Sequence, residues 1–415
     1  MTSSRRFLAT SSLAISGALA LGALGAVAAQ AETVTLDKGI TVSGGGSTFV
    51  SNFVDQCRAD LKTELGVNVA YQGIGSGAGR SGFIAGTLDF SGSDVPFTSA
   101  ELPTVKNKFV YIAFAAGGIA VTYKVPGLTD LKFSAPTLAK IFAGSILKWS
   151  DEAIAKENPG ANLPDQVIRV VVRSDSSGTS NVFSDYLSTA GKGGWTKGTQ
   201  STFPVPAGNG IAQKGSDGVT NYLAGDQGNY AITYAEASFA TERKLAIGKI
   251  INTAGNAVTP DPANVSEAIT AATVNDDGTL LLNFNVTAPK AYPISTTAYL
   301  IASQSMDKAK ADVLRTFLNY GLNGCQKKAE KIGYAPLPAN LVKLGMDALA
   351  KINPGSGDVP IIGAAAAPTP TTIAAAATVA TTVPAATAAP TTKATLTTNK
   401  ATTKKKVTKT TKKKK

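Results

Sequence analysis

Alternation between short strand-forming runs and amphipathic helical segments is the feature that most constrains the fold of this chain. The runs at 67–72 and 167–173 have the length and the apolar content of strands. Residues 47–65 follow a helical pattern, because apolar side chains recur at every fourth position, and Ser47 or Thr48 is expected to cap this helix. Strands that alternate with helices predict an α/β fold with ligands at the carboxyl ends of the strands.

The same alternation extends over the whole folded part of the chain. Further strands are expected at 34–44, 109–114, 118–125, 230–237 and 292–301, and further helices at 80–86, 135–144, 178–188 and 309–323. About 330 residues remain between the two unusual ends of the chain, which is enough for two lobes.

Residues 1–31 have the pattern of an export signal. Arg5 and Arg6 precede a short apolar stretch rich in Gly and Ala, which ends in an A-x-A cleavage pattern at Ala31. A membrane-spanning helix needs about 20 strongly apolar residues, so a cleaved signal is favoured. We expect an exported protein, in the periplasm or at the cell surface or wall, without a lipid anchor because no cysteine lies near the cleavage site. The general and the twin-arginine export routes both stay open.

The segment 364–415 consists mainly of Ala, Thr, Pro and Lys. It contains ten lysines, no acidic residue and no periodic apolar pattern, so we expect it to be disordered. Residues 32–363 carry 28 basic and 28 acidic side chains, and the net charge of +12 therefore belongs to the two ends. The basic net charge therefore gives no evidence for a nucleic-acid-binding face on the folded part, and we expect no nucleic-acid partner.

The lysines of the tail suggest a partner of their own. We hypothesise that they hold the protein on anionic cell-wall polymers or on phospholipid heads, because lysines near an anionic surface each contribute about 1 kcal/mol. A solvated extension without a function and a glycosylated Thr/Pro-rich segment are the alternatives.

The absence of histidine from the sequence excludes several enzyme classes. Ser-His-Asp and Cys-His sites need an imidazole as proton shuttle, and most zinc sites need more soft ligands than Cys57 and Cys325. We expect no catalytic residue, no metal and no cofactor. In an exported chain the two cysteines indicate one disulfide, and two buried free thiols are the alternative.

Four turns rich in Gly and Ser share one character: 43–49, 73–79, 91–94 and 173–180. Each follows an apolar strand, and glycine lets backbone N–H groups come close to a ligand. A helix that begins at such a turn adds unpaired N–H groups and a partial positive charge, which together favour an anion. Neither the dinucleotide fingerprint nor the P-loop pattern is present. Arg173 would add a planar fork of donors for an oxyanion.

Two carboxylates lie in these turns. Asp94 would repel an anion unless that anion carries a proton, as phosphate does at neutral pH and sulfate does not. An ionised Asp94 accepts a hydrogen bond from a P–OH group, whereas it faces only acceptors on sulfate, so it predicts discrimination between the two. Asp175 either pairs with Arg173 and fixes its orientation or caps the turn.

With these turns in place, the chain resembles the periplasmic phosphate-binding protein of bacterial phosphate ABC importers. The matching segments run in family order across 33–350: "GGGSTF", "YQGIGSGAG", "LDFSGSDVP", "KWSDEAIAKENPG", "RSDSSGTS", "AITYAEA", "YPISTTAYLI" and "GYAPLP". The resemblance implies a bilobal type II periplasmic-binding-protein fold, in which two α/β lobes are joined by two crossing strands near 113–121 and 291–299. The implied division is a signal peptide at 1–31, lobe one at 32–117 and 292–363, lobe two at 118–291, and the disordered tail at 364–415.

The resemblance also implies a site. It assigns phosphate contacts to Thr48, Phe49, Ser76, Asp94, Arg173, Ser177, Gly178 and Thr179, with support from Ser93 and Asp175. It places the Cys57 and Cys325 segments in one lobe, which favours their disulfide.

The implied function is that of a non-catalytic, monomeric protein that captures inorganic phosphate between its lobes and delivers it to the permease of a phosphate ABC transporter. The alternatives are a binding protein for another oxyanion such as sulfate or molybdate, an extracellular phosphatase, and a surface adhesin. The phosphatase would need a nucleophile and usually metal ions, and the sequence offers no obvious carboxylate cluster for them.

Overall fold

The computed structural model describes residues 33–360. The expected signal peptide at 1–31 and the expected tail at 364–415 lie outside these described residues. No helix among 33–360 is long and apolar enough to cross a membrane.

A mixed sheet forms the framework of the described residues. Its strands lie in the order β2-β1-β3-β14-β4-β8-β6-β7, and β9 pairs with β4. They are β1 (Thr41–Gly46), β2 (Asn68–Gly73), β3 (Phe90–Ser93), β4 (Phe109–Lys124), β6 (Arg169–Arg173), β7 (Gly210–Gln213), β8 (Ala231–Glu236), β9 (Ala246–Ile247) and β14 (Ser295–Ser303). Two small sheets comprise β5 (Lys132–Ser134), β10 (Lys249–Ile251) and β11 (Ala257–Val258), and β12 (Thr273–Val274) and β13 (Leu280–Leu281).

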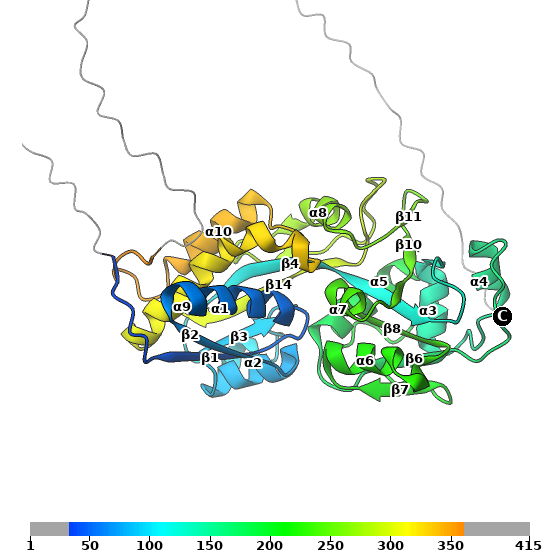
Figure 1. The fold of residues 1–415 in the computed structure, drawn as a ribbon, viewed down its shortest axis with the longest axis horizontal. Helices are drawn as coiled ribbons and strands as arrows, with labels where there is room; N and C mark the ends of the chain where they lie inside the picture. The colour runs from blue at the N-terminus through cyan, green and yellow to red at the C-terminus, as the bar shows by residue number, and fades with distance from the viewer. Residues whose placement is uncertain (1–32, 361–415) are drawn as a thin grey trace, which may run out of the picture. The chain divides into compact units, whose positions relative to one another are not determined.

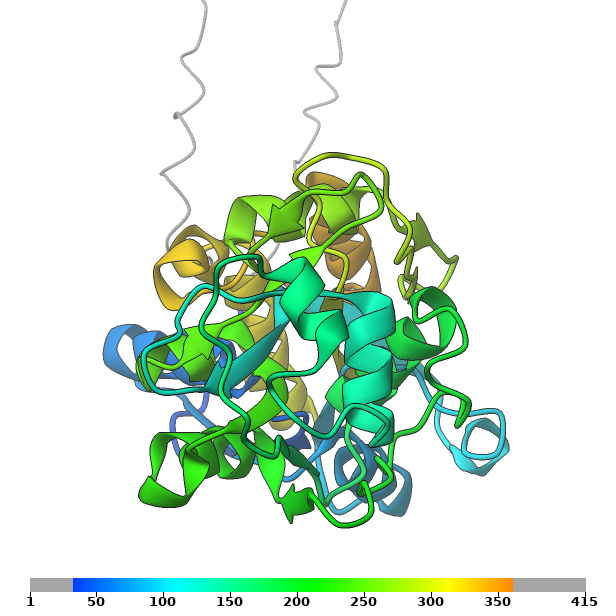
Figure 2. The same cartoon turned by 90° about the vertical axis from the view of Figure 1, so that its right-hand side faces the viewer.

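Helices cover this framework. They are α1 (Ser51–Leu65), α2 (Ser76–Ala85), α3 (Ala135–Ala143), α4 (Glu152–Glu157), α5 (Gly178–Ala190), α6 (Gly215–Ala224), α7 (Ala237–Glu242), α8 (Pro262–Thr270), α9 (Lys308–Leu322) and α10 (Ala339–Leu349). Short 3-10 turns are η1 (Leu102–Thr104), η2 (Asp226–Gly228), η3 (Cys325–Lys328) and η4 (Glu330–Ile332). When the molecule is turned by 90°, the green and teal segments face the viewer and the blue segments lie behind them (Figure 2).

Strand β4 connects two groups of elements. Its first part, from Phe109 to Gly118, pairs antiparallel with β14, and its last part, from Ile119 to Lys124, pairs antiparallel with β8. Figure 1 shows β4 in cyan running from the group of α1, α2 and β1–β3 toward the group of α5–α7 and β6–β8. We call these groups the β1 group and the β6 group.

The prediction of two separate strands at 109–114 and 118–125 is wrong, because both belong to the 16-residue β4. The small residues between them do not form a turn. Gly117 instead packs closely against Phe49, because a Cβ at this position would come within 2.8 Å of the Phe49 ring. Glycine is therefore needed here for close packing, and the strand continues through it.

Two helix starts also differ from the predictions. Helix α1 begins after Val50, which has no side-chain cap, so neither Ser47 nor Thr48 caps it. Their hydroxyls make tertiary hydrogen bonds instead, which are described below. Helix α2 begins at Ser76, four residues before the predicted start at 80, so the turn at 73–79 forms its first turn.

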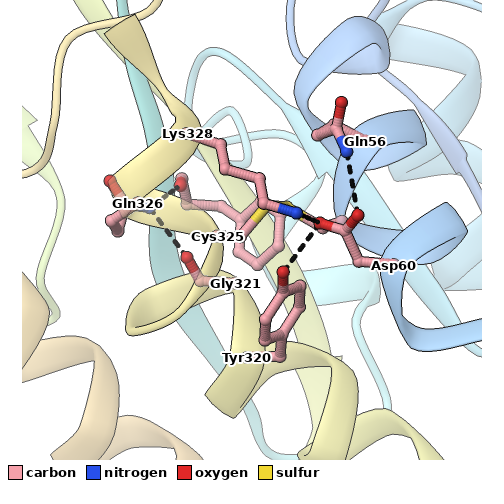
Figure 3. Close-up of a disulfide and its surroundings, with 9 residues drawn as sticks. Gln56, Asp60, Tyr320, Gly321, Cys325, Gln326 and Lys328 are labelled. Atoms are coloured by element: carbon pink, nitrogen blue, oxygen red, sulfur yellow. Dashed lines mark hydrogen bonds and ion pairs between the residues drawn. A yellow bond between two sulfur atoms is a disulfide. The ribbon is translucent and has the colours of Figure 1, made fainter. Parts of the chain in front are cut away.

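The predicted disulfide is confirmed. Cys57 on α1 and Cys325 in η3 are joined over a sequence separation of 268 residues, and both side chains are fully buried. Because α1 also packs against α9, the bond fixes the end of the core to its beginning (Figure 3).

A charged and polar cluster lies beside the disulfide (Figure 3). The Asp60 carboxylate accepts hydrogen bonds from Tyr320 Oη at 2.7 Å, Lys328 Nζ at 2.8 Å and Gln56 Nε2 at 2.9 Å. Burial raises the pKa of Asp60, but the bonds from Lys328, Tyr320 and Gln56 outweigh it and hold that pKa below 3.8. The cluster therefore keeps an ionised carboxylate paired next to the covalent link.

Candidate functional site

Two of the predicted turns meet although they lie far apart in the sequence. Asp94 directly follows β3, and Thr179 belongs to the first turn of α5 after β6. Thr179 Oγ1 donates a hydrogen bond of 2.9 Å to Asp94 Oδ2. The end of β3 with Asp94 in the β1 group and the turn at 173–180 in the β6 group are thus in direct contact. Residues 43–46 and 91–93, which were predicted to lie in turns, are the last residues of β1 and β3.

Asp94 lies at the centre of this contact and is only 3% exposed. Its other carboxylate oxygen, Oδ1, accepts a hydrogen bond from Ser47 Oγ. Burial raises the pKa of Asp94, and the bonds from Ser47 and Thr179 and the charges of Arg173 and Arg80 oppose that rise without cancelling it. The site therefore holds a desolvated carboxyl group whose pKa lies above its ordinary value of 3.8.

Arg173 ends β6 and is 1% exposed. Its Nε donates to Asp175 Oδ1 at 2.8 Å and its Nη2 donates to Asp175 Oδ2 at 2.5 Å, so Asp175 holds the guanidinium in a fixed plane. Burial raises the pKa of Asp175, but the bonds to Arg173 and its charge outweigh that effect and lower the pKa below 3.8. Of the two roles left open for Asp175, the structure shows the pairing with Arg173.

The third guanidinium nitrogen of Arg173 is different. Nη1 is buried and has no hydrogen-bond partner among the described residues. A buried N–H group without a partner is costly, and such groups are rare in folded proteins. The charge of Arg173 acts on Asp94, so the guanidinium lies near the place where the turns meet, and the hydrogen-bonding capacity of Nη1 is unused among the described residues.

The remaining predicted residues surround this centre. Ser76 Oγ lies 3.4 Å from the backbone nitrogen of Asp94. A Cβ on Gly178 would lie 2.7 Å from both Asp94 Cβ and Ser76 Oγ, so only glycine permits this approach. Ser177 caps α5, because its Oγ accepts from Ser180 N at 3.1 Å.

Two predicted residues have other partners. The backbone nitrogen of Phe49 donates to Ser47 Oγ at 3.0 Å, and the Phe49 side chain is buried in the core. Ser93 Oγ donates to Val95 O at 2.5 Å and accepts from Arg80 Nη1 at 3.1 Å. Ser93 therefore fixes the backbone on both sides of Asp94 and connects it to Arg80.

Thr48 connects the two groups of elements through a residue that the sequence reading missed. Thr48 Oγ1 lies 2.9 Å from Ser216 Oγ and accepts a hydrogen bond of 3.2 Å from Ser216 N. The preceding Gly215 donates its N–H to Asp175 Oδ1 at 2.9 Å. The start of α6 therefore supports both the Thr48 turn and the Arg173–Asp175 pair.

Arg80 was also missed. It is 3% exposed, and its Nε forms an ion pair with Glu101 Oε2 at 2.9 Å. Its position in α2 beside Ser93 adds a second positive charge near Asp94.

Among residues 33–360, no group of three or more His, Cys, Asp or Glu side chains is arranged to hold a metal ion.

Comparison with known proteins gives the class. A family profile described as the PBP superfamily domain matches residues 26–323. A solved structure described as a high-affinity periplasmic phosphate-binding protein bound with phosphate has a TM-score of 0.61 at 24% identity, and the match covers 73% of this chain and 92% of that one. A phosphate-binding protein from Stenotrophomonas maltophilia has a TM-score of 0.56 at 23% identity, with the same coverage of both chains. These structures share the fold, and the predicted type II periplasmic-binding-protein fold is confirmed.

Curated relatives narrow the class. The chain is 35% identical over 314 residues to "Phosphate-binding protein PstS" from Xylella fastidiosa strain Temecula1. This match covers 74% of this chain and 84% of that protein. It is 35% identical over 314 residues to "Phosphate-binding protein PstS 3" from Mycobacterium leprae, which covers 72% of this chain and 83% of that one. The chain therefore belongs to the PstS family of phosphate-binding proteins within the PBP superfamily.

Proposed function

We propose that this protein captures inorganic phosphate outside the cytoplasm and delivers it to the permease of a phosphate ABC transporter. Membership of the PstS family and the gathering of the predicted turns support this function. The proposed contacts are Thr48, Phe49, Ser76, Asp94, Arg173, Ser177, Gly178 and Thr179, with Ser93 and Asp175 in support.

The single observation that carries the proposal is the buried, unpartnered Nη1 of Arg173. Asp175 already occupies the other edge of the guanidinium, so its orientation is fixed before a ligand arrives. A tetrahedral oxyanion would give Nη1 a charge-assisted hydrogen bond and remove the cost of burying it.

Asp94 gives the proposal its chemical specificity. Phosphate keeps a proton at neutral pH, and that P–OH group would donate to the Asp94 carboxylate beside Arg173. Sulfate has no such proton, so it would place one acceptor against another in a buried site. A binding protein with this arrangement should take phosphate and reject sulfate.

Binding is proposed to close the molecule around the ion. In this view lobe one comprises 32–117 and 292–363, lobe two comprises 118–291, and β4 and β14 are the crossing strands. The hydrogen bonds Thr179–Asp94 and Thr48–Ser216 would then join the two lobes in the closed form. Hinge closure around a ligand that contacts both lobes is the usual motion of such proteins.

The proposal includes no chemical step. The protein would act as a monomer, without a catalytic residue, in the periplasm or at the cell surface. The lysines of 364–415 would add retention on anionic wall polymers or lipid heads. Extraction of cells with increasing salt, with and without this segment, tests the retention, and equal release of both forms would contradict it.

The function is tested by calorimetric titration of the secreted protein after ligand has been stripped from it. Phosphate and sulfate would be added in separate titrations at neutral pH. The proposal predicts saturable binding of one phosphate per chain and no heat from sulfate beyond dilution. Absence of phosphate binding would refute it, and equal binding of both ions would refute the role of Asp94.

A further inference from the structure

A second set of hydrogen bonds joins the β1 group to the β6 group, away from the turns that form the proposed site. Asn52 is the second residue of α1, and its Nδ2 donates to Ser238 Oγ at 2.9 Å and to Glu242 Oε1 at 2.8 Å. Both acceptors lie on α7, which follows β8 directly. The amide of one side chain thus connects residues separated by 186 and 190 positions in the sequence.

The acceptor on Ser238 is held in place. Its backbone N–H donates to both carboxylate oxygens of Glu236, at 3.1 and 3.0 Å, and its hydroxyl donates to Glu236 Oε2. The hydroxyl proton of Ser238 is therefore used on Glu236, and its oxygen is left to accept from Asn52. Glu236 is fully buried, and in the β4–β8 ladder it lies opposite Ile119.

The donor is linked to the proposed phosphate site by its place in the chain. Asn52 follows the 43–49 turn within one helical turn of Thr48, and Tyr334 Oη fixes the intervening Phe49 by donating to its carbonyl oxygen at 2.5 Å. The orientation of the first turn of α1 therefore determines where both Thr48 and Asn52 lie. Contact between Asn52 and α7 requires the same approach of the two groups as contact between Thr48 and Ser216.

We propose that Asn52 is a positioning residue that latches the closed form and so sets how long phosphate stays bound. This inference rests on the proposed function, and it adds to it a determinant of residence time that does not touch the ion. A contact made only in the closed form shifts the balance between open and closed molecules by its own differential free energy.

The latch should act on release more than on capture. Ligand enters the open form, in which the Asn52 contacts are absent, so the association rate should not depend on them. Release requires that these bonds break, so their loss should appear in the dissociation rate. If Asn52 had a purely structural role, its replacement would lower the stability of the ligand-free protein. It would then not change the dissociation rate alone while leaving the association rate unaffected.

The experiment uses an isosteric change of amide to acid. Asn52→Asp removes both donated bonds and places a carboxylate against Glu242, which also contacts Arg243 at 3.4 Å. Gln56→Glu is the matched control, because Gln56 lies one turn later on α1 and its amide donates only within that helix, to Asp60 at 2.9 Å. The rescue variant combines Asn52→Asp with Glu242→Gln. In this variant the amide at position 242 donates to the carboxylate at position 52, so the hydrogen bond is restored in the opposite direction.

Association and dissociation of radiolabelled phosphate would be followed on the full secreted chain, with a chase of unlabelled phosphate. Asn52→Asp should speed dissociation by about tenfold, as expected when hydrogen bonds to a charged partner are lost. Its association rate and the thermal midpoint of the ligand-free protein should stay within error of wild type. Gln56→Glu should leave both rates unchanged, and Glu242→Gln in the Asn52→Asp background should recover most of the slow dissociation.

The outcomes separate the inference from the function on which it rests. If wild type binds phosphate and Asn52→Asp dissociates no faster than Gln56→Glu, the latch is refuted and the proposed function stands. Faster dissociation that Glu242→Gln does not reverse would also refute the pairing. If wild type binds no phosphate, the proposed function falls and the latch falls with it.

Discussion

Thr179 Oγ1 donates a 2.9 Å hydrogen bond to Asp94 Oδ2, and this bond joins two turns that are 85 residues apart in the sequence. Both residues are nearly inaccessible to solvent, so the bond is made in a desolvated environment. Two Gly- and Ser-rich segments that follow apolar strands far apart in the sequence are thereby brought to one place.

Replacement of Thr179 by valine tests this contact, because valine keeps the shape and removes the hydroxyl. Phosphate affinity should fall by about tenfold, since a charged acceptor loses a buried donor. Calorimetric titration measures the change. Thr63→Val is the control, because Thr63 is exposed on α1 and its hydroxyl bonds only to Ala59 O. An unchanged affinity in Thr179→Val would contradict the role of the contact.

Asp94→Asn tests the discrimination between phosphate and sulfate. The amide nitrogen is a donor, which suits the acceptor oxygens of sulfate, whereas the carboxylate does not. We expect measurable sulfate binding in the variant and weaker phosphate binding. The measurement is a sulfate titration of both proteins at neutral pH, and failure of the variant to bind sulfate would mean that Asp94 does not set the selectivity.

Removal of the disulfide should lower stability without changing ligand affinity. The bond between Cys57 and Cys325 closes a long loop, and its loss by Cys57→Ala with Cys325→Ala should cost about 3 kcal/mol. Neither residue contacts the proposed phosphate site, so phosphate affinity should stay near wild type. Denaturant unfolding and titration of the same preparations measure both quantities, and a large loss of affinity with little loss of stability would contradict this division.

The buried Glu236 predicts a specific dependence of stability on pH. Burial raises its pKa to about 8, although the hydrogen bonds from the Ser238 hydroxyl and backbone N–H oppose the rise. A folded-state pKa above the ordinary 4.5 means that the folded protein binds the extra proton, so its contribution is complete below pH 4.5 and is lost as the pH rises toward 8.

Glu236→Gln removes this titration. The free energy of unfolding of wild type should fall relative to the variant by up to about 1.4 kcal/mol per pH unit between these values. Chemical unfolding of both proteins across that pH range measures the difference between their free energies of unfolding. The contributions of the other titrating groups are common to both proteins and cancel in this difference. A constant difference between the two would show that Glu236 has the same pKa in the folded and unfolded protein.

The sequence indicated much of this site because parallel strands end at a common edge of a sheet. For this reason the turns after β1 and β3, which are parallel neighbours, can be expected to meet. Strand β6 runs in the opposite direction within the sheet, so the meeting of its turn with the other two depends on how β4 connects the β1 group and the β6 group, which local sequence does not give. The disulfide was left open by the residues alone, since two cysteines in an exported chain do not by themselves specify a pair. The resemblance to a family favoured it by placing both segments in one lobe.

Other features could not be read from local patterns. Ser216 was missed because β7 is four residues long and only half apolar, although "KGSDG" after it repeats the composition of the predicted turns. The single strand β4 was divided because Ala and Gly have low strand propensity, and its pairing with β14 and β8 overrides that preference. The caps predicted at Ser47 and Thr48 were lost to tertiary partners, Asp94 and Ser216, which local sequence cannot reveal.

The most direct test of the central claim is a crystal structure of the protein with bound phosphate. We predict one ion within hydrogen-bonding distance of Arg173 Nη1, of the backbone N–H groups of Gly178 and Thr179, and of Asp94. A phosphate bound elsewhere on the molecule, with Arg173 Nη1 still unpartnered, would contradict the proposed site.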